Sequence, residues 1–266
     1  MSGEPGPALA GRRVLVTGGS SGIGACIARE LARAGCVVAV CARRTDLLES
    51  VAADLRRHSP RSTALTVDLA HLAGLEAFAA RATEALGGID VLVNNAGQMG
   101  GTRLPDVDAD DLERLMRVNY LSPVRLTLAV LPQMLERGDG QIVNVSSVAA
   151  RLSPPTESAY AASKAALTAF FESAAADLWG TGVTVHNVYP GWIRTTDDPP
   201  DALHQDLTGE TPETVAAAVR RQLEDGTFEI YVPEEFKTFF SQRARDVGAF
   251  VAASGAYANE RLGPLP

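Results

Sequence analysis

Residues 13–24 read Arg-Val-Leu-Val-Thr-Gly-Gly-Ser-Ser-Gly-Ile-Gly, and this stretch decides the fold. Its apolar beginning predicts a buried strand, and the residues that follow Gly22 predict a helix. Glycines between a strand and a helix let the backbone turn tightly and approach a phosphate, to which the helix N-terminus offers free N–H groups. The spacing Gly18-x-x-x-Gly22-x-Gly24 is therefore a variant of the dinucleotide-binding fingerprint.

The same residues allow two other interpretations. Gly18-x-Ser20-x-Gly22 is also the nucleophile-elbow pattern of α/β-hydrolases, in which Ser20 would be the nucleophile. The elbow would then lie on the first strand, and the downstream chain lacks a Gly-rich oxyanion loop and a clearly placed late acid–histidine pair. A serine hydrolase is thus the weaker hypothesis, and a purely structural Gly-rich turn is the second alternative.

Strand and helix patterns alternate along almost the whole chain. Apolar runs predict strands at 14–17, 37–40, 64–67, 91–94, 142–145, 183–188 and 230–232. Helical patterns lie between them at 23–34, 46–57, 72–86, 109–137, 159–179 and 213–224. Continuously apolar strands are typical of a parallel sheet covered on both faces. We predict the α/β class: one domain with a doubly wound, mostly parallel seven-stranded sheet, helices on both faces and a ligand site at the carboxyl ends of the strands.

Composition narrows the function classes. The chain has 266 residues, 46% of them hydrophobic and 21% charged, and its net charge of −8 argues against binding nucleic acid. No apolar stretch approaches the roughly 18 residues of a membrane span, and no signal peptide precedes Val14, so a cytoplasmic protein is expected. The three cysteines and four histidines lack metal-ligand spacing, so no metal site is expected.

Three segments differ from the predicted domain of residues 12–233. Residues 1–11 are rich in Gly and Pro and are expected to form a flexible tail. Residues 196–212 are acidic and contain Pro199-Pro200, which suggests a mobile lid over a substrate. Residues 234–266 predict a helical extension packed on the same domain. Aromatic residues such as Phe236 give this extension an apolar side, which could cover a pocket, a partner subunit or a membrane surface, or simply join the core.

The end of the second predicted strand points to the cofactor. Dinucleotide folds that prefer NAD usually carry an acid there, whereas this chain has Ala42 followed by Arg43 and Arg44. A guanidinium can bind a 2′-phosphate through paired, charge-assisted hydrogen bonds, so NADP(H) is expected; solvated loop charges are the alternative. Asp68, which ends the third strand, is expected either to accept from the adenine amino group or to cap the next helix.

Tyr160 and Lys164 lie four residues apart in a predicted helix, which places the phenol and the ammonium on one face. A phenol ordinarily ionises near pH ~10. A cation held nearby lowers the pKa of the phenol and makes proton exchange with a substrate oxygen practicable. Taken alone, the pair could also be a chance neighbourhood on a solvated helix.

Six motifs in one order make the chain resemble the short-chain dehydrogenase/reductase family over residues 12–195. They are the glycine loop, Asn94-Asn95-Ala96-Gly97, Asn119, Ser147 thirteen residues before Tyr160, Tyr160-x-x-x-Lys164 and Pro190-Gly191-x-x-x-Thr195. The resemblance implies a Rossmann fold and an NADP-dependent oxidoreductase that interconverts a carbonyl and an alcohol. A non-catalytic dinucleotide-sensing protein is the alternative from another class.

The resemblance also implies a role for each matched residue. Tyr160 would exchange a proton with the substrate oxygen, and Lys164 would bind the nicotinamide ribose and lower the pKa of Tyr160. Ser147, with Ser146 as its rival, would hold the carbonyl oxygen, and Asn119 would hold a water that passes protons to Lys164. The expected cofactor contacts are Gly18, Ser20, Ser21, Gly22, Ile23, Gly24, Arg43, Arg44, Asp68, Leu69, Asn95, Ala96, Gly97, Tyr160, Lys164, Pro190, Gly191, Ile193 and Thr195.

Substrate and assembly are only broadly indicated. The resemblance implies a small-molecule substrate and a homodimer or homotetramer formed through the long helices at 109–137 and 159–179. The pocket walls are expected from residues 98–104, 149–157 and the lid. Many family members end in a Thr-Gly-x-x-x-x-x-Asp-Gly-Gly stretch, whereas this chain has Phe228-Glu-Ile-Tyr-Val-Pro and a helical tail. That departure argues against a fatty-acid-synthesis ketoreductase and favours the broad-specificity and lipid-type branches.

Overall fold

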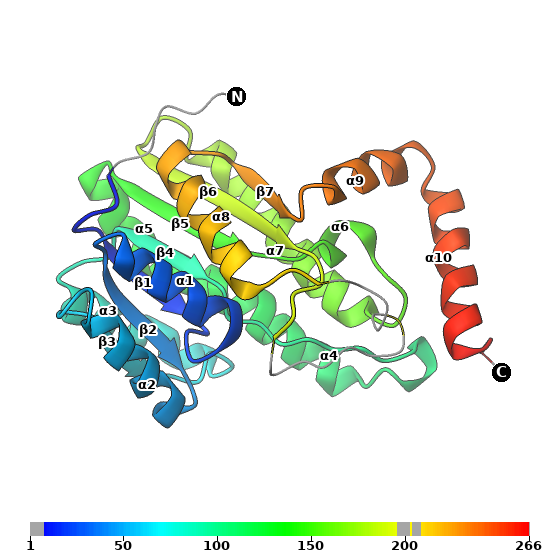
Figure 1. Cartoon of the computed structure of the whole chain (residues 1–266), viewed down its shortest axis with the longest axis horizontal. Helices are drawn as coiled ribbons and strands as arrows, with labels where there is room; N and C mark the ends of the chain where they lie inside the picture. Colours follow the sequence, from blue (N-terminus) through cyan, green and yellow to red (C-terminus); the bar gives the residue numbers. More distant parts are fainter. Residues whose placement is uncertain (1–7, 196–202, 204–208, 266) are drawn as a thin grey trace.

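The computed structural model describes residues 8–195, 203 and 209–265. Seven strands form one sheet in the order β3-β2-β1-β4-β5-β6-β7, and all six strand pairings are parallel (Figure 1). Each predicted strand is present, and the predicted doubly wound parallel sheet is confirmed. The strands are β1 (Arg13–Thr17), β2 (Val37–Ala42), β3 (Thr63–Thr66), β4 (Val91–Asn94), β5 (Gly140–Val145), β6 (Val183–Pro190) and β7 (Glu229–Val232).

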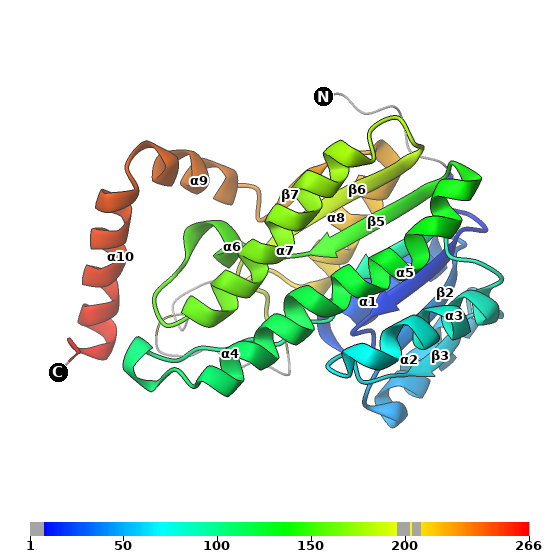
Figure 2. The same ribbon diagram turned by 180° about the vertical axis from the view of Figure 1, so that it is seen from behind.

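Helices cover both faces of the sheet. One face carries α1 (Gly22–Arg33), α2 (Thr45–Arg56) and α8 (Pro212–Asp225) (Figure 1). The other carries α3 (Leu75–Leu86), which a short 3-10 turn at Leu72–Gly74 precedes, with α5 (Ser122–Arg137) and α7 (Ser158–Asp177) (Figure 2). Val14 and Val16 of β1 pack into the first layer and Leu15 into the second. Both faces of the strand are thus buried, which explains its continuously apolar sequence.

The prediction of one continuous helix over 109–137 is wrong at its centre. The chain forms α4 (Ala109–Met116), then a π-helical turn at Arg117–Leu121, then α5. Residue 123 is proline and has no N–H to donate to the carbonyl of Asn119, so the α-helical bond between them cannot form. The hydrogen-bond pattern changes from the fourth to the fifth preceding residue, and the N–H of Ser122 donates to the carbonyl of Arg117. Such turns are frequent at functional sites.

The C-terminal extension is helical, as predicted, and forms two helices. After a short helix in the middle of the chain, α6 (Ala149–Leu152), the last elements are α9 (Phe236–Arg245) and α10 (Val247–Leu262). The first lies beside the end of β7, and α10 projects from the body of the molecule (Figure 1). Arg103 donates to the carbonyl of Gly263 at 2.7 Å and thereby satisfies the C-terminal end of α10. None of the described helices is long and apolar enough to cross a bilayer.

The boundaries of the predicted tail and lid are only partly visible. Residues 1–7 of the tail and most of the predicted lid at 196–212 lie outside the described residues. The expectation of a flexible tail up to residue 11 is wrong at its end, because Leu9 is buried in the core. The N–H of Gly11 also donates to the carbonyl of Gly35 at 2.9 Å. The packed domain therefore begins before residue 12.

Candidate active site

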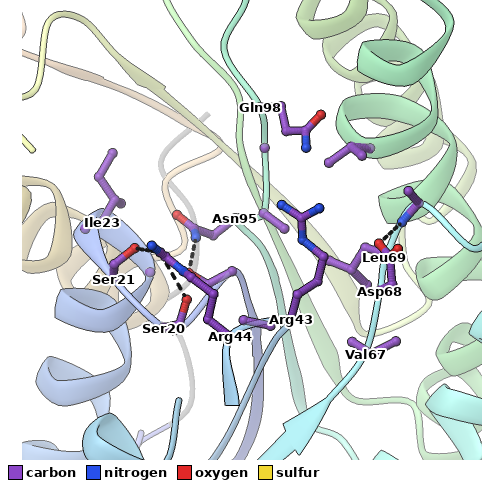
Figure 3. Close-up of a pocket in the computed structure, with 18 of the residues that line it drawn as sticks. Ser20, Ser21, Ile23, Arg43, Arg44, Val67, Asp68, Leu69, Asn95 and Gln98 are labelled. Carbon is purple, nitrogen blue, oxygen red and sulfur yellow. Dashed lines mark hydrogen bonds between the residues drawn. The ribbon is translucent and has the colours of Figure 1, made fainter. Parts of the chain in front are cut away.

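Two adjoining cavities lie at the carboxyl edge of the sheet. The smaller, of about 320 Å³, is lined by the glycine loop and by the residues that follow β2 and β3 (Figure 3). The larger, of about 680 Å³, is lined by residues that follow β5 and β6 and by α7. Both cavities are bordered by Ile23, Asn95, Gly97, Gln98 and Thr195. A ligand with two ends can therefore extend from one cavity into the other.

The glycine loop is packed against the turn that follows β4. Gly18 has a φ of +67°, and a Cβ there would lie 2.8 Å from the Cα of Ala96. A Cβ on Gly24 would lie 2.3 Å from Nδ2 of Asn95. Thr17 holds this turn, since its Oγ1 accepts the N–H groups of Asn95 and Ala96 at 3.0 Å. Only glycine allows the loop and the first turn of α1 to approach so closely, which leaves the helix N-terminus facing the smaller cavity.

Arg43 and Arg44 border the smaller cavity at the end of β2. Nη2 of Arg44 donates to Oγ of Ser21 at 2.6 Å and lies 3.5 Å from Oγ of Ser20. The Arg43 side chain points away from this loop, so the two guanidinium groups reach different parts of the cavity (Figure 3). The position before them, Ala42, carries no carboxylate. The donor set therefore fits an anion near the glycine loop better than a ribose hydroxyl pair.

Asp68 lies in the same cavity with Leu69. Its Oδ1 accepts the N–H of Ala70 at 3.0 Å, so the carboxylate stabilises the turn after β3. The first helical turn after it begins only at Leu72. Asp68 therefore holds its own loop and is not the N-cap of that helix. A carboxylate has further acceptor sites, so this bond still allows a ligand to donate to it.

Tyr160 and Lys164 both line the larger cavity from α7. Their exposed fractions are 8% and 4%, which rules out a chance pair on a solvated surface. Nζ of Lys164 donates to the carbonyl of Val145 at 2.9 Å and lies 5.9 Å from the centre of the Tyr160 ring. Burial lowers the pKa of Lys164 to about 8. The helix thus holds an ammonium of lowered pKa beside a phenol inside one cavity.

Ser146 and Ser147 end up with different partners. The Ser146 hydroxyl lies 2.9 Å from Oγ1 of Thr168 and donates to the carbonyl of Lys164 at 3.3 Å, so it is engaged with α7. Oγ of Ser147 accepts the N–H of Ala149, the first residue of α6, at 3.1 Å. A hydroxyl that accepts one bond still has a proton to donate. Both serines line the larger cavity, but the Ser146 hydroxyl is engaged with α7, so Ser147 is the better placed to donate to a ligand there.

Asn119 is buried in the π-helical turn and joins it to two other segments. Its Oδ1 accepts the N–H of Gln98 at 2.8 Å, and its Nδ2 donates to the carbonyl of Gln98 and to Oγ of Ser163, each at 2.9 Å. A Cβ on Gly97 would lie 3.2 Å from Nζ of Lys164 and 3.4 Å from Oδ1 of Asn119. The structure therefore brings Asn119, Gly97 and Lys164 together at the back of the cavity.

The segment after β6 lies between the two cavities. The N–H of Gly191 donates to the carbonyl of Val232 at 2.8 Å, which fixes its start. Ile193 pairs with Glu210 in an isolated bridge, and Thr195 lines both cavities next to Gly22. Pro190, Gly191 and Ile193 line the larger cavity. Every predicted site residue except Asn119 thus lines one of the two cavities.

Comparison with known proteins identifies the family. The profile described as short chain dehydrogenase matches residues 12–202. The chain belongs to the short chain dehydrogenase family. A short chain dehydrogenase of Pseudocercospora fijiensis is 38% identical over 195 residues, which is 73% of this chain and 63% of that relative. The chain therefore spans less than two thirds of that relative's length.

Solved structures of short-chain dehydrogenases share the fold. One from Streptomyces avermitilis aligns with a TM-score of 0.79 and 31% identity, over 91% of this chain and 95% of that one. A metagenomic short-chain oxidoreductase, solved in complex with NADP, aligns with a TM-score of 0.73 and 31% identity, over 85% of this chain and 97% of that one. The predicted resemblance and fold are confirmed, and the family is one of oxidoreductases.

The hydrolase interpretation of Ser20 finds no support in this family member. The hydroxyl of Ser20 lies beside the Arg44 guanidinium, which cannot act as a base because it stays protonated. His186 is held elsewhere, by Thr184 and by the carbonyl of Thr227. No histidine is among the described residues that line the smaller cavity. Within the described part of the chain, no three His, Cys, Asp or Glu residues lie close enough to hold a metal ion.

Two features of the larger cavity escaped sequence reasoning. Phe236 of α9 forms part of its wall, whereas its aromatic neighbours in the sequence suggested several surfaces without deciding among them. Trp192 also lines the cavity, although the motif from Pro190 to Thr195 gives its side chain no role. The predicted walls from residues 98–104 and 149–157 do contribute Gln98, Met99, Leu152, Pro154 and Glu157. Phe236 could be placed only once β7 and α9 were positioned beside β6.

Proposed function

We propose that this family member is an NADP(H)-dependent oxidoreductase that interconverts a ketone or aldehyde and an alcohol by hydride transfer. The observation that carries the proposal is the convergence of Ser147, Tyr160 and Lys164 on one cavity that adjoins the glycine loop. A non-catalytic sensor has no need of a buried phenol and ammonium beside a serine hydroxyl. Those groups are the ones required to move a proton onto an oxygen.

Each of these residues has its own role in the transfer of the proton. In the direction of reduction, the Tyr160 hydroxyl donates its proton to the carbonyl oxygen. Ser147 donates a hydrogen bond to the same oxygen and stabilises the negative charge that develops there. With a pKa of about 8, Lys164 is mostly charged at neutral pH, and its charge favours the phenolate that Tyr160 becomes. Asn119 positions the π-helical turn next to Lys164, where a bound water could return a proton.

The cofactor would lie across both cavities. The glycine loop and the N-terminus of α1 would bind the pyrophosphate, and Asp68 and Leu69 would border the adenine. Ile193 of the larger cavity and Thr195, which lines both cavities, would bind the nicotinamide carboxamide. When bound, the nicotinamide supplies or accepts the hydride. The protein supplies the alignment of the substrate carbon with that ring, which brings reacting atoms to roughly 3–3.5 Å.

The 2′-phosphate of NADP is the anion that Arg43 and Arg44 fit. Both cations border the cavity, and the Ala42 side chain offers no acceptor for a ribose hydroxyl. The NADP complex of the metagenomic relative is consistent with this choice. A guanidinium binds phosphate through two parallel N–H groups, which NADH cannot satisfy.

A Tyr160→Phe variant tests the catalytic assignment. It removes the proton that Tyr160 donates but keeps the ring, so turnover of carbonyl substrates should fall by at least about 10²-fold. NADPH affinity, measured by fluorescence titration, should stay within a few-fold of the unaltered protein. Turnover is measured from NADPH absorbance over a panel of ketones and aldehydes. Turnover that survives the substitution would overturn the assignment, and a protein that binds NADPH but converts nothing would favour the sensor.

An Arg43→Ala variant tests the cofactor preference. Losing a charge-assisted bond to the 2′-phosphate should weaken NADPH roughly 10- to 100-fold and leave NADH nearly unchanged. Arg44→Ala should show the same selectivity, with an added effect through Ser21. Arg57→Ala is the matched control, because Arg57 is exposed on the next helix and pairs with Asp54. Equal losses for NADPH and NADH would refute the 2′-phosphate interpretation.

A further inference from the structure

Arg151 of α6 joins three other elements behind the larger cavity. Its Nη2 donates to Glu172 of α7, to the hydroxyl of Tyr189 in β6 at 3.0 Å and to Glu229 of β7 at 3.1 Å. These partners lie 21, 38 and 78 residues away in the sequence. One guanidinium therefore faces two carboxylates that would otherwise repel each other across the edge of the sheet.

The same guanidinium stacks in an aromatic cluster. It lies over the Tyr189 ring, 4.8 Å from its centre, and 6.0 Å from the centre of the Phe240 ring. The rings of Tyr189 and Tyr231 are stacked, with their centres 5.0 Å apart and an interplanar angle of 16°. The centres of the Tyr231 and Phe240 rings lie 5.1 Å apart. Burial raises the pKa of Tyr189, so its hydroxyl stays a neutral hydrogen-bond partner. Charge and stacking together thus hold Phe240 of α9 against the sheet.

Helix α9 depends on this cluster for its position. None of its residues is fully buried, so it has no core of its own. Phe240 contacts the cluster, and Phe236, one turn earlier, contacts Gly191, where a Cβ would lie 2.4 Å from the Phe236 ring. Phe236 is also a wall of the larger cavity. Movement of Phe240 would therefore carry Phe236 away from the cavity.

Arg151 also lies four residues after Ser147 on the segment that holds that serine. The N–H of Ala149, at the start of α6, donates to Oγ of Ser147, and Val148, Ala149 and Leu152 line the cavity. Ser147 is thus held by the backbone of α6, whereas the Arg151 side chain binds α7, β6 and β7.

We propose that Arg151 is a positioning residue that holds α9, and with it Phe236, as a wall of the substrate cavity, and so sets how large a carbonyl substrate binds well. The kinetic part of this inference rests on the proposed function. Arg151 itself contacts neither cavity. It acts through Phe240 and Phe236, so its loss should affect substrate binding more than the chemical step.

The first experiment needs no substrate. Amide hydrogen exchange of the segment 233–245 is compared between the unaltered protein and Arg151→Met. This substitution keeps a side chain of similar length but removes the charge, the N–H donors and the stacking of the guanidinium. Exchange there should become faster by about tenfold or more, because the cluster that holds Phe240 loses its central cation. Arg220→Met is the matched control, since Arg220 also pairs with two carboxylates, Glu30 and Glu224, but touches neither cavity. Unchanged exchange in Arg151→Met would overturn the proposal.

The second experiment is kinetic. With NADPH and a carbonyl substrate large enough to reach Phe236, Arg151→Met should raise KM about tenfold and leave kcat within a few-fold. The KM for NADPH should not change, because Phe236 does not line the smaller cavity. Arg151→Lys keeps the charge but loses the planar guanidinium with its paired N–H donors. Its KM for the carbonyl substrate should therefore lie between those of the unaltered protein and Arg151→Met. If kcat and the KM for NADPH changed as much as the KM for the carbonyl substrate, a role through α9 would be contradicted.

A double-mutant cycle separates action through Phe236 from a general loss of structure. If Arg151 acts by holding Phe236, Arg151→Met should add little to the KM of Phe236→Ala, so the two effects should not be additive. Fully additive effects would refute the connection. If Arg151→Met does not fold, Phe240→Ala detaches α9 from the same cluster and should raise KM in the same way; an unaltered KM there would also refute it. If no carbonyl is reduced even by the unaltered protein, the proposed function fails while the exchange comparison still decides the role of Arg151.

Discussion

Ser146 and Ser147 are adjacent residues of the same type, yet their surroundings differ. The strand β5 ends at Val145, and the chain then turns so that one hydroxyl faces α7 and the next faces the start of α6. The Ser146 hydroxyl is bound to a side chain and a carbonyl of α7. A hydroxyl that holds two elements together contributes to stability, whereas one directed into a cavity is available to a substrate.

This difference predicts different effects of two alanine substitutions on turnover. Ser147→Ala should lower kcat by about 10²–10³-fold, the usual loss for one oxyanion donor, and should also lower the free energy of unfolding by about 1 kcal/mol because the N–H of Ala149 loses its acceptor. Ser146→Ala should retain most of the turnover but lower the free energy of unfolding by about 1 kcal/mol, because Thr168 and the carbonyl of Lys164 lose a buried partner. Steady-state kinetics and thermal unfolding of both variants provide the comparison. A reversed pattern would reassign the donor to Ser146.

At the scale of elements, the π-helical turn at Arg117–Leu121 is the feature that changes the site most. Its formation follows from Pro123, but its position against α7 and the turn after β4 follows from the Asn119 amide. The amide both accepts from and donates to the backbone of Gln98, which only an amide side chain of this length can do. The turn is thereby fixed next to Gly97 and Lys164.

An Asn119→Asp variant tests this arrangement. A carboxylate can still accept from the N–H of Gln98 but cannot donate to its carbonyl or to Ser163, whose hydroxyl proton already goes to the carbonyl of Tyr160 at 2.7 Å. The free energy of unfolding should fall by about 2–3 kcal/mol, measured by denaturant titration. Asn259→Asp on α10 is the control, because the Asn259 side chain is exposed and its Oδ1 accepts from Arg103, a bond that a carboxylate keeps, so stability should change little. A stable Asn119→Asp variant would show that the amide does not hold the turn.

At the scale of the whole molecule, the face with α5 and α7 remains open (Figure 2). Leu128 and Leu135, two turns apart on α5, are 55% and 41% exposed. An apolar helical surface of this kind is typical of a contact between subunits. Helix α10 offers a second exposed apolar surface, with Val251 60% exposed. We propose a homodimer formed through α5 and α7.

Two charge substitutions distinguish the candidate surfaces. Leu128→Glu would place a carboxylate in the centre of the α5 contact, so light scattering after size exclusion should show a monomer instead of a dimer. Val251→Glu on α10 should leave the dimer intact. Dissociation by Val251→Glu alone would move the interface to α10, and a monomer in the unaltered protein would contradict the dimer.

The strands, the order of the motifs and the family were determined by the sequence alone. Strands and helices follow from the local period of apolar residues, and the glycine loop, Tyr160 and Lys164 lie in short motifs whose spacing is itself the signal. The predicted C-terminal ends of helices lie within a residue or two of the observed ones where a glycine ends the helix, as Gly87 ends α3 and Gly226 ends α8. The π-helical turn was missed because apolar periodicity continues through it.

Only the tertiary structure decided what Ser146 is bound to, where Phe236 lies and what Arg151 holds. Each of these depends on residues distant in the sequence, as the 78 residues between Arg151 and Glu229 illustrate. A local pattern reports which face of an element is apolar but not which neighbour covers that face. That is set by the order of the strands in the sheet and by the packing of side chains between layers. The opening stretch 13–24 therefore determined the fold, whereas the shape of the substrate cavity was decided by how β6, β7 and α9 came together.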